Sequence, residues 1–98
     1  MRMKDKVALI SGAAGGMGAA TARLFAREGA RAVVVADILD KEGAATVAEI
    51  EKAGGHASYI HLDVTDEAQW QAAVEKTVTS YGRLDVLVNN AGISGSAE

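Results

Sequence analysis

The segment from Ser11 to Gly18 has a composition and a spacing that suit phosphate binding. It contains four glycines within eight residues: Gly12, Gly15, Gly16 and Gly18. Because glycine has no Cβ atom, backbone N–H groups in such a turn can approach a phosphate closely. A helical pattern begins near Met17, and the positive end of that helix dipole would face the same group. The segment therefore predicts a turn that binds the pyrophosphate of a dinucleotide, with a simple turn as the alternative.

Asp37 is a candidate for binding the ribose of the same dinucleotide. It follows the apolar run 32–36, roughly 20 residues after the glycine turn, where an acid can accept hydrogen bonds from the adenosine ribose. A solvated loop carboxylate and a helix cap are the alternatives, and Asp40 could instead be the cap. The carboxylate favours NAD, because the 2′-phosphate of NADP would bring negative charge against it.

The sequence offers no obvious cation to offset this repulsion. The two positions at which a phosphate-binding cation would help hold Gly15 and Ile38. Arg31 and Lys41 are the other candidates, and we expect both to face solvent. The cofactor predicted from these residues is NAD.

Asp63 and Val64 form a third candidate contact. They follow the apolar pattern 58–62, and the carboxyl ends of parallel strands face the ligand crevice. Contact with the adenine ring is one interpretation. The other is that Asp63 caps the helix that begins after Thr65, and the local sequence leaves both open.

These residues need a scaffold in which strands and helices alternate. Apolar, β-branched runs predict strands at 7–10, 32–36 and 86–88, with a weaker one at 58–62. Helical patterns occupy 16–28, 41–53 and the segment from 66 to 81, each followed by glycine. Parallel strands need long crossovers, so the chain predicts an α/β fold: a doubly wound, Rossmann-type parallel sheet with right-handed crossovers.

Each predicted helix has an apolar stripe that we expect to face the sheet. In the first helix the stripe is Met17, Ala20, Thr21, Leu24 and Phe25. In the second, with Asp40 as a predicted N-cap, it is Ala44, Val47, Ala48 and Ile50. In the third, which begins with Asp66 and Glu67, it is Ala73, Val74, Thr77, Val78 and Tyr81, and Trp70 is predicted to be a packing residue.

Length and composition limit the classes of function. The 98 residues fit one small domain, and a net charge of −3 gives no broad positive field for nucleic acid or an anionic membrane. The chain has no cysteine and only two histidines, His56 and His61, so we expect no metal site. No spanning segment or signal peptide is evident, which predicts cytoplasmic residence.

The spacing Ser11-Gly12-x-x-x-Gly16-x-Gly18, with Asp37, Asp63-Val64 and Asn89-Asn90-Ala91-Gly92, resembles the short-chain dehydrogenase/reductase family over the whole chain. Ser11 stands where the family usually has threonine. The resemblance implies that 12–18, Met17 included, hold the pyrophosphate, Asp37 and Ile38 the adenosine ribose region, and Asp63 and Val64 the adenine. It also implies that Asn90, Ala91 and Gly92 contact the central part of the cofactor. For Asn89 a structural role is the alternative.

The family's catalytic Tyr-x-x-x-Lys is not in this sequence. Tyr59 is followed four positions later by Asp63, and Tyr81 by Asp85, so neither matches. Ser94 and Ser96 are interpreted as loop residues. We expect no catalytic residue within 1–98, which we interpret as the N-terminal dinucleotide-binding part of a single Rossmann domain, with the catalytic Ser, Tyr and Lys beyond Glu98.

The resemblance implies that the complete protein is an NAD(H)-dependent oxidoreductase acting on a small-molecule secondary alcohol or ketone, often as a homotetramer. Segments 37–43 and 61–65 are most similar to members that act on cyclic alcohols and hydroxysteroids. The alternative is a nucleotide-binding module without catalysis, or an isolated half of the fold. A Tyr-x-x-x-Lys after Glu98 would favour the enzyme.

Residues 1–98 alone are predicted to have no dehydrogenase activity, because the groups that would move the substrate proton are not among them. A strand at 86–88 without a further neighbour also predicts a marginally stable or self-associating segment. The measurement is alcohol-dependent NADH formation by the purified segment. A rate above the protein-free control would contradict this prediction.

Overall fold

The computed structural model describes residues 3–90, in which strands and helices alternate. The elements are β1 (Val7–Ser11), α1 (Gly16–Arg27), β2 (Ala32–Asp37), α2 (Asp40–Lys52), β3 (Ala57–His61), α3 (Glu67–Tyr81) and β4 (Val86–Asn89). Each lies within about two residues of its predicted range. The glycines that follow the three helices, Gly29, Gly54 and Gly82, all have positive φ. They end the helices as the sequence predicted.

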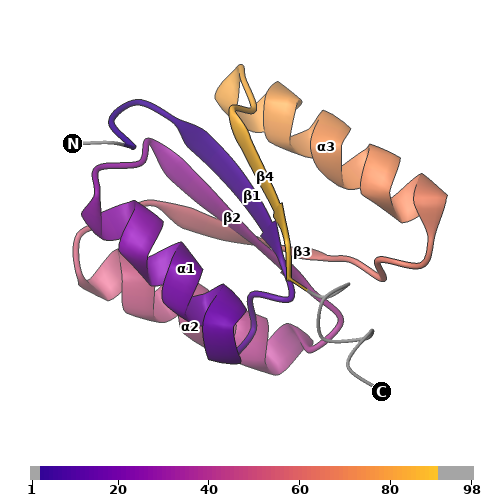
Figure 1. Ribbon diagram of the computed structural model, residues 1–98, viewed down its shortest axis with the longest axis horizontal. Helices are drawn as coiled ribbons and strands as arrows, with labels where there is room; N and C mark the ends of the chain where they lie inside the picture. The colour runs from indigo at the N-terminus through magenta and orange to yellow at the C-terminus, as the bar shows by residue number, and fades with distance from the viewer. Residues whose placement is uncertain (1–2, 91–98) are drawn as a thin grey trace.

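The four strands form one parallel sheet in the order β3-β2-β1-β4. In the register, Leu9 of β1 pairs with Val34 of β2 on one side and with Leu87 of β4 on the other. Helices α1 and α2 cover one face of the sheet and α3 covers the other (Figure 1). This confirms the predicted doubly wound, Rossmann-like architecture.

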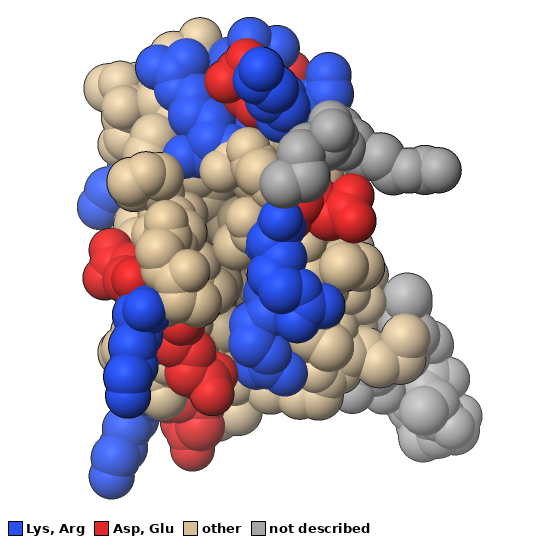
Figure 2. All heavy atoms as spheres, turned by 90° about the vertical axis from the view of Figure 1, so that its left-hand side faces the viewer, with Lys and Arg blue, Asp and Glu red and all other residues tan. Residues whose placement is uncertain are grey.

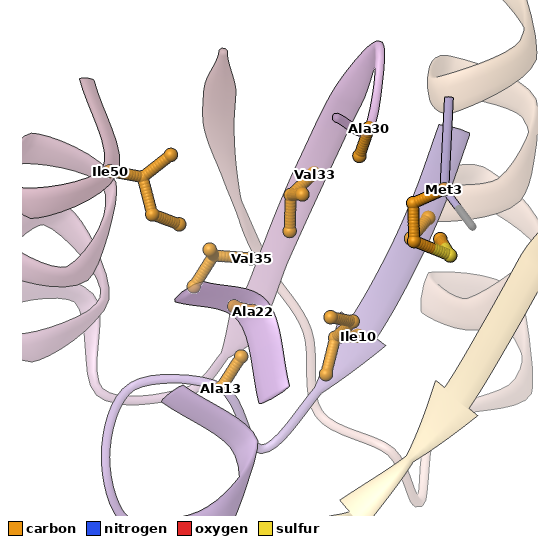
Figure 3. Packing of buried hydrophobic residues seen from close by; sticks show 9 residues of the cluster. Met3, Ile10, Ala13, Ala22, Ala30, Val33, Val35 and Ile50 are labelled. Carbon is orange, nitrogen blue, oxygen red and sulfur yellow. The ribbon is translucent and has the colours of Figure 1, made fainter. Parts of the chain in front are cut away.

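Two hydrophobic clusters, one on each face, bury the central strands β1 and β2. On the side of α1 and α2, Ile10, Val33 and Val35 pack with Ala22 and Ile50 (Figure 3). On the side of α3 the cluster comprises Leu9, Val34, Ala36, Leu62 and Ala73. Full burial of each Val, Leu or Ile side chain contributes about 1.5–3 kcal/mol. The continuous apolar strands in the sequence reflect burial on both faces.

Helix α1 faces the sheet mainly through small residues, so most of the predicted stripe was wrong. Its buried residues are Gly18, Ala19 and Ala22, whereas Met17 is 80% and Leu24 43% exposed. Ala20 is exposed and Thr21 half-buried, whereas the half-buried Phe25 packs against the core cluster as predicted. At Gly18 the helix is too close to the end of β1 for any side chain, so small residues occupy this part of its inner face.

Helix α2 also differs from its prediction. Ile50 is buried and the half-buried Val47 packs against the core cluster, both as expected. The other buried residues of the helix are Gly43 and Thr46, while Ala44 and Ala48 are exposed. Asp40 is the first helical residue, and no side-chain hydrogen bond caps the helix. The N-cap prediction was wrong because the Asp40 carboxylate instead accepts hydrogen bonds from β3.

Helix α3 agrees with most of its prediction. The Asp66 carboxylate caps it by accepting hydrogen bonds from the N–H groups of Ala68 and Gln69. Ala73 and Thr77 are buried, and Val78 is more exposed than the periodicity suggested. The partly buried residues packed against the α3-side cluster are Trp70, Val74 and Tyr81.

Among residues 3–90 no helix is both long and apolar enough to cross a membrane.

Asp85 joins the start of β4 to the start of β1. Its carboxylate accepts hydrogen bonds from the Val7 N–H at 2.9 Å and from the Arg83 guanidinium, while its own N–H donates to the Val7 carbonyl. The Arg83 hydrogen bond, followed by the Val7 N–H, lowers the pKa of Asp85 to about 2. One ionised side chain therefore links the starts of two neighbouring strands.

Replacing Asp85 with Asn should weaken the fold near neutral pH and change its acid sensitivity. The folded-state pKa lies below the ordinary value of 3.8, so this carboxylate stabilises the fold above that value and loses its effect as pH falls from about 3.8 to about 2. Thermal unfolding of wild type and Asp85→Asn should therefore differ at pH 7 and converge toward pH 2. Glu51→Gln, at an exposed position of α2, is the control. A constant difference across this pH range would contradict the assignment.

Candidate functional site

A cavity of about 530 Å³ lies where the carboxyl ends of the strands meet. Residues from the glycine turn after β1 and from the segments that follow β2, β3 and β4 line it. They are Gly12, Gly15, Asp37, Ile38, Leu39, Leu62, Asp63, Val64, Thr65 and Asn90. The strand order reverses at β1, between β2 and β4, and the crevice at such a switch point is where parallel α/β sheets bind ligands.

The glycine turn has a backbone conformation that larger residues rarely adopt. Gly12 and Gly16 both have positive φ, 65° and 59°. A Cβ atom at Gly18 would overlap the Gly12 carbonyl oxygen and lie 2.7 Å from its carbonyl carbon. By contrast, a Cβ atom at Gly15 would meet nothing within 4 Å. Gly18 thus allows α1 to approach β1, while Gly15 lies at the open side of the turn.

The N-terminus of α1 carries no negative charge of its own. It has neither a side-chain cap nor an acidic residue in its first turn, whereas α2 begins with Asp40 and Glu42, and α3 with Asp66 and Glu67. The positive end of the α1 dipole and its first N–H groups are therefore available to an anionic group beside the cavity. This arrangement fits the pyrophosphate of a dinucleotide.

The Asp37 carboxylate joins the end of β2 to the glycine turn. Its Oδ2 accepts a hydrogen bond from the Ala14 N–H at 3.0 Å, and its Oδ1 accepts from the N–H groups of Ile38 and Leu39 at 2.7 and 3.1 Å. Asp37 is half-buried at the cavity wall and caps no helix. The orientation of this carboxylate is thus fixed by three backbone donors.

Asp63 is not the cap of α3, because Asp66 has that role. Its Oδ1 instead accepts hydrogen bonds from the hydroxyl and the N–H of Thr65, at 2.7 and 2.9 Å. These two bonds, the hydroxyl first, lower the pKa of Asp63. Beside it, the Val64 carbonyl accepts a hydrogen bond from the Trp70 indole at 3.0 Å. The segment after β3 therefore has a defined shape at the cavity wall.

Two asparagines at the end of β4 differ in their surroundings. Asn89 Oδ1 accepts a hydrogen bond from the buried Ser11 hydroxyl at 2.8 Å, which links β4 to β1 and supports a structural role. Asn90 lines the cavity, and its buried Nδ2 has no hydrogen-bond partner within residues 3–90. A buried amide donor at a cavity wall fits a ligand that carries acceptor oxygens.

The cavity brings together seven of the twelve residues predicted to bind the cofactor: Gly12, Gly15, Asp37, Ile38, Asp63, Val64 and Asn90. Gly16 and Gly18 shape the turn without lining the cavity, and Met17 is exposed on α1. Ala91 and Gly92 lie outside the described residues.

Three lining residues were missed: Leu39, Leu62 and Thr65. Each of the three is next to a predicted residue in the sequence. Their positions at or just after the ends of predicted strands could therefore have identified them. Over the described part of the chain, no group of three or more His, Asp or Glu side chains could hold a metal ion.

Comparison with known proteins identifies the family. Residues 6–98 match the family described as short chain dehydrogenase, and this chain belongs to that family. Over 92 residues it is 58% identical to the 3-alpha-(or 20-beta)-hydroxysteroid dehydrogenase of Mycobacterium bovis, which covers 94% of this chain and 34% of that protein. Dehydrogenases of this family use nicotinamide cofactors, NAD or NADP.

Two further proteins are similar to this chain. The trans-4-hydroxycyclohexanecarboxylate dehydrogenase of Sinomonas cyclohexanicum is 52% identical over 105 residues, which cover 99% of this chain and 40% of that protein. The crystal structure of a hydroxysteroid dehydrogenase from Escherichia coli superposes with a TM-score of 0.85 at 37% identity, covering 89% of this chain and 37% of that one. The chain thus spans between 34% and 40% of the length of these relatives.

Gly18→Ala should destabilise the protein by about 1–3 kcal/mol, because the new methyl group would overlap backbone atoms of Gly12 and separate α1 from β1. Gly15→Ala is the matched control, since its methyl group would enter open space and its backbone is extended. We expect a change within about 0.5 kcal/mol for this variant. Urea unfolding of the complete protein measures both. Equal losses of stability would refute the proposed close approach.

Proposed function

We propose that the complete protein is an NAD(H)-dependent oxidoreductase that interconverts a secondary alcohol and a ketone, and that residues 1–98 supply its cofactor-binding part. Membership of the short-chain dehydrogenase family supports this proposal. The names of two relatives, a hydroxysteroid dehydrogenase and a trans-4-hydroxycyclohexanecarboxylate dehydrogenase, suggest a cyclic alcohol or hydroxysteroid as the substrate class.

In this proposal each wall of the cavity binds one part of the cofactor. The glycine turn and the N-terminus of α1 bind the pyrophosphate, Asp37 and Ile38 contact the adenosine ribose region, and Asp63 and Val64 contact the adenine. Asn90, with Ala91 and Gly92, contacts the central part. The bound nicotinamide supplies the hydride chemistry, so the contribution of this part of the chain is to bind and orient the cofactor.

The observation that carries the choice of NAD is the fixed carboxylate of Asp37 in a cavity wall without cations. Among residues 3–90 the ionisable side chains that line the cavity are two acids, Asp37 and Asp63, and none is a Lys or Arg. Arg31 precedes β2, at the opposite end of the strand from Asp37, and Lys41 is exposed on α2. Lys and Arg instead spread over the face where the strands begin (Figure 2). A 2′-phosphate would therefore meet negative charge without compensation.

We place the catalytic Ser, Tyr and Lys outside residues 1–98. Homotetramer formation and cytoplasmic residence complete the proposal as expectations from family resemblance and composition. A nucleotide-binding module without catalysis remains the second candidate, because the described residues contribute to a cofactor site and include no Tyr-x-x-x-Lys. Binding of NADH by a complete protein that turns over no alcohol would favour that module.

The complete protein should prefer NAD(H) over NADP(H) by at least about tenfold, because a charged hydrogen bond to the ribose contributes roughly 1.5–3 kcal/mol. Asp37→Ala should lower the ratio of kcat/KM with NAD(H) to kcat/KM with NADP(H). The measurement is kcat/KM for both cofactors with one shared substrate, in wild type and variant. Glu75→Ala, an exposed acid on α3, should leave the ratio unchanged. Equal values in the wild type would overturn the assignment.

A further inference from the structure

The turn from Asp37 to Asp40 is held at both ends by one side chain of β3. The Tyr59 hydroxyl lies 2.6 Å from the Asp37 carbonyl oxygen and 2.6 Å from Oδ1 of Asp40. Its single proton is shared between these two acceptors. The Asp37 carbonyl also accepts a hydrogen bond from the Leu62 N–H at 2.9 Å. The backbone that presents the Asp37 carboxylate is thus fixed from β3.

Helix α2 is shaped to accommodate this tyrosine. A Cβ atom at Gly43 would overlap the Tyr59 ring, so the helix packs directly on the ring at a residue that has no side chain. One turn further along α2, the Thr46 hydroxyl donates a hydrogen bond to the Ala14 carbonyl at 3.1 Å. Helix α2, the glycine turn and the Asp37 turn are therefore held in one arrangement around Tyr59.

The charges around the hydroxyl keep it a hydrogen-bond donor. Burial, followed by the hydrogen bond to the Asp40 carboxylate, raises the pKa of Tyr59. The same hydrogen bond, followed by that of His61, lowers the pKa of Asp40. His61 Nδ1 lies 2.7 Å from Asp40 Oδ1. Asp40 therefore stays an ionised acceptor at neutral pH, and Tyr59 stays protonated.

We propose that Tyr59, together with Asp40, is a positioning residue for cofactor selection: its hydroxyl fixes the turn that presents the Asp37 carboxylate to the ribose. This inference rests on the proposed function of Asp37. Nothing in the sequence motifs assigns a role to Tyr59, which lies on β3 with its hydroxyl directed at backbone and side-chain atoms of the turn. Discrimination between NAD and NADP then depends on a residue that does not line the cavity.

The test is Tyr59→Phe in the complete protein, which keeps the ring against Gly43 and removes only the hydroxyl. Titration of intrinsic fluorescence gives the Kd of NADH and of NADPH. We expect the Kd of NADH to rise roughly three- to tenfold and the Kd of NADPH to change less. The ratio of the Kd of NADPH to the Kd of NADH should therefore fall. Thermal unfolding without cofactor measures any general loss of stability.

Tyr81→Phe is the matched control. The Tyr81 hydroxyl donates a hydrogen bond to Ser58 at 2.9 Å, and its ring packs on the α3 side of the sheet, away from the Asp37 turn. It should lower stability without changing the ratio of the two Kd values. Asp40→Asn, which keeps an acceptor for Tyr59, should narrow the ratio less than Tyr59→Phe.

The outcomes separate this inference from the proposal on which it rests. A wild type that binds NADH and NADPH equally well overturns the role of Asp37 itself. A wild type that prefers NADH, with a Tyr59→Phe variant whose ratio is unchanged or shifts no more than that of Tyr81→Phe, overturns the positioning role alone. A narrowed ratio in Tyr59→Phe, with no shift in Tyr81→Phe, supports it.

Discussion

The close approach of α1 to the end of β1 is the constraint on which the site depends. At Gly18 even a Cβ atom would overlap the backbone of Gly12, so the helix begins directly against the strand. The fully buried residues of α1 are correspondingly small: Gly18, Ala19 and Ala22. The close approach also brings the first N–H groups of the helix to the edge of the cavity. One contact thus determines both the packing of α1 and the position of its N-terminus.

The sequence predicted the order of the elements and most of the cavity wall, because both follow from local signals. Apolar β-branched runs predict buried parallel strands, and residues directly after such strands lie at one edge of the sheet. The small and polar residues on the inner faces of α1 and α2, such as Gly18, Gly43 and Thr46, could not be predicted from hydrophobicity. Gly43 is buried because the Tyr59 ring occupies the space of its side chain. That contact joins residues far apart in the sequence, and a periodicity argument does not include it.

Asp40 is a second residue whose contacts depend on residues far away in the sequence. An acid just before a helical pattern can act as an N-cap, and Asp66 has this role in α3. Asp40 has the same local setting, yet its carboxylate binds Tyr59 and His61 of β3. Tertiary partners therefore decided between two uses of one residue type. The sequence-based prediction of the Asp37 position did not depend on such partners, since it followed from the strand end alone.

The N-terminus of α1 has no side-chain cap, so its attraction for an anion does not depend on any one side chain. Its attraction for an anion comes from N–H groups and aligned peptide dipoles, which carry no ionisable proton and belong to every residue type except proline. This contribution is insensitive to acid and base over the range in which side chains titrate. Replacing the side chain of the exposed Met17 leaves these N–H groups and dipoles in place. Residue 17 can therefore vary without a change in their attraction for an anion.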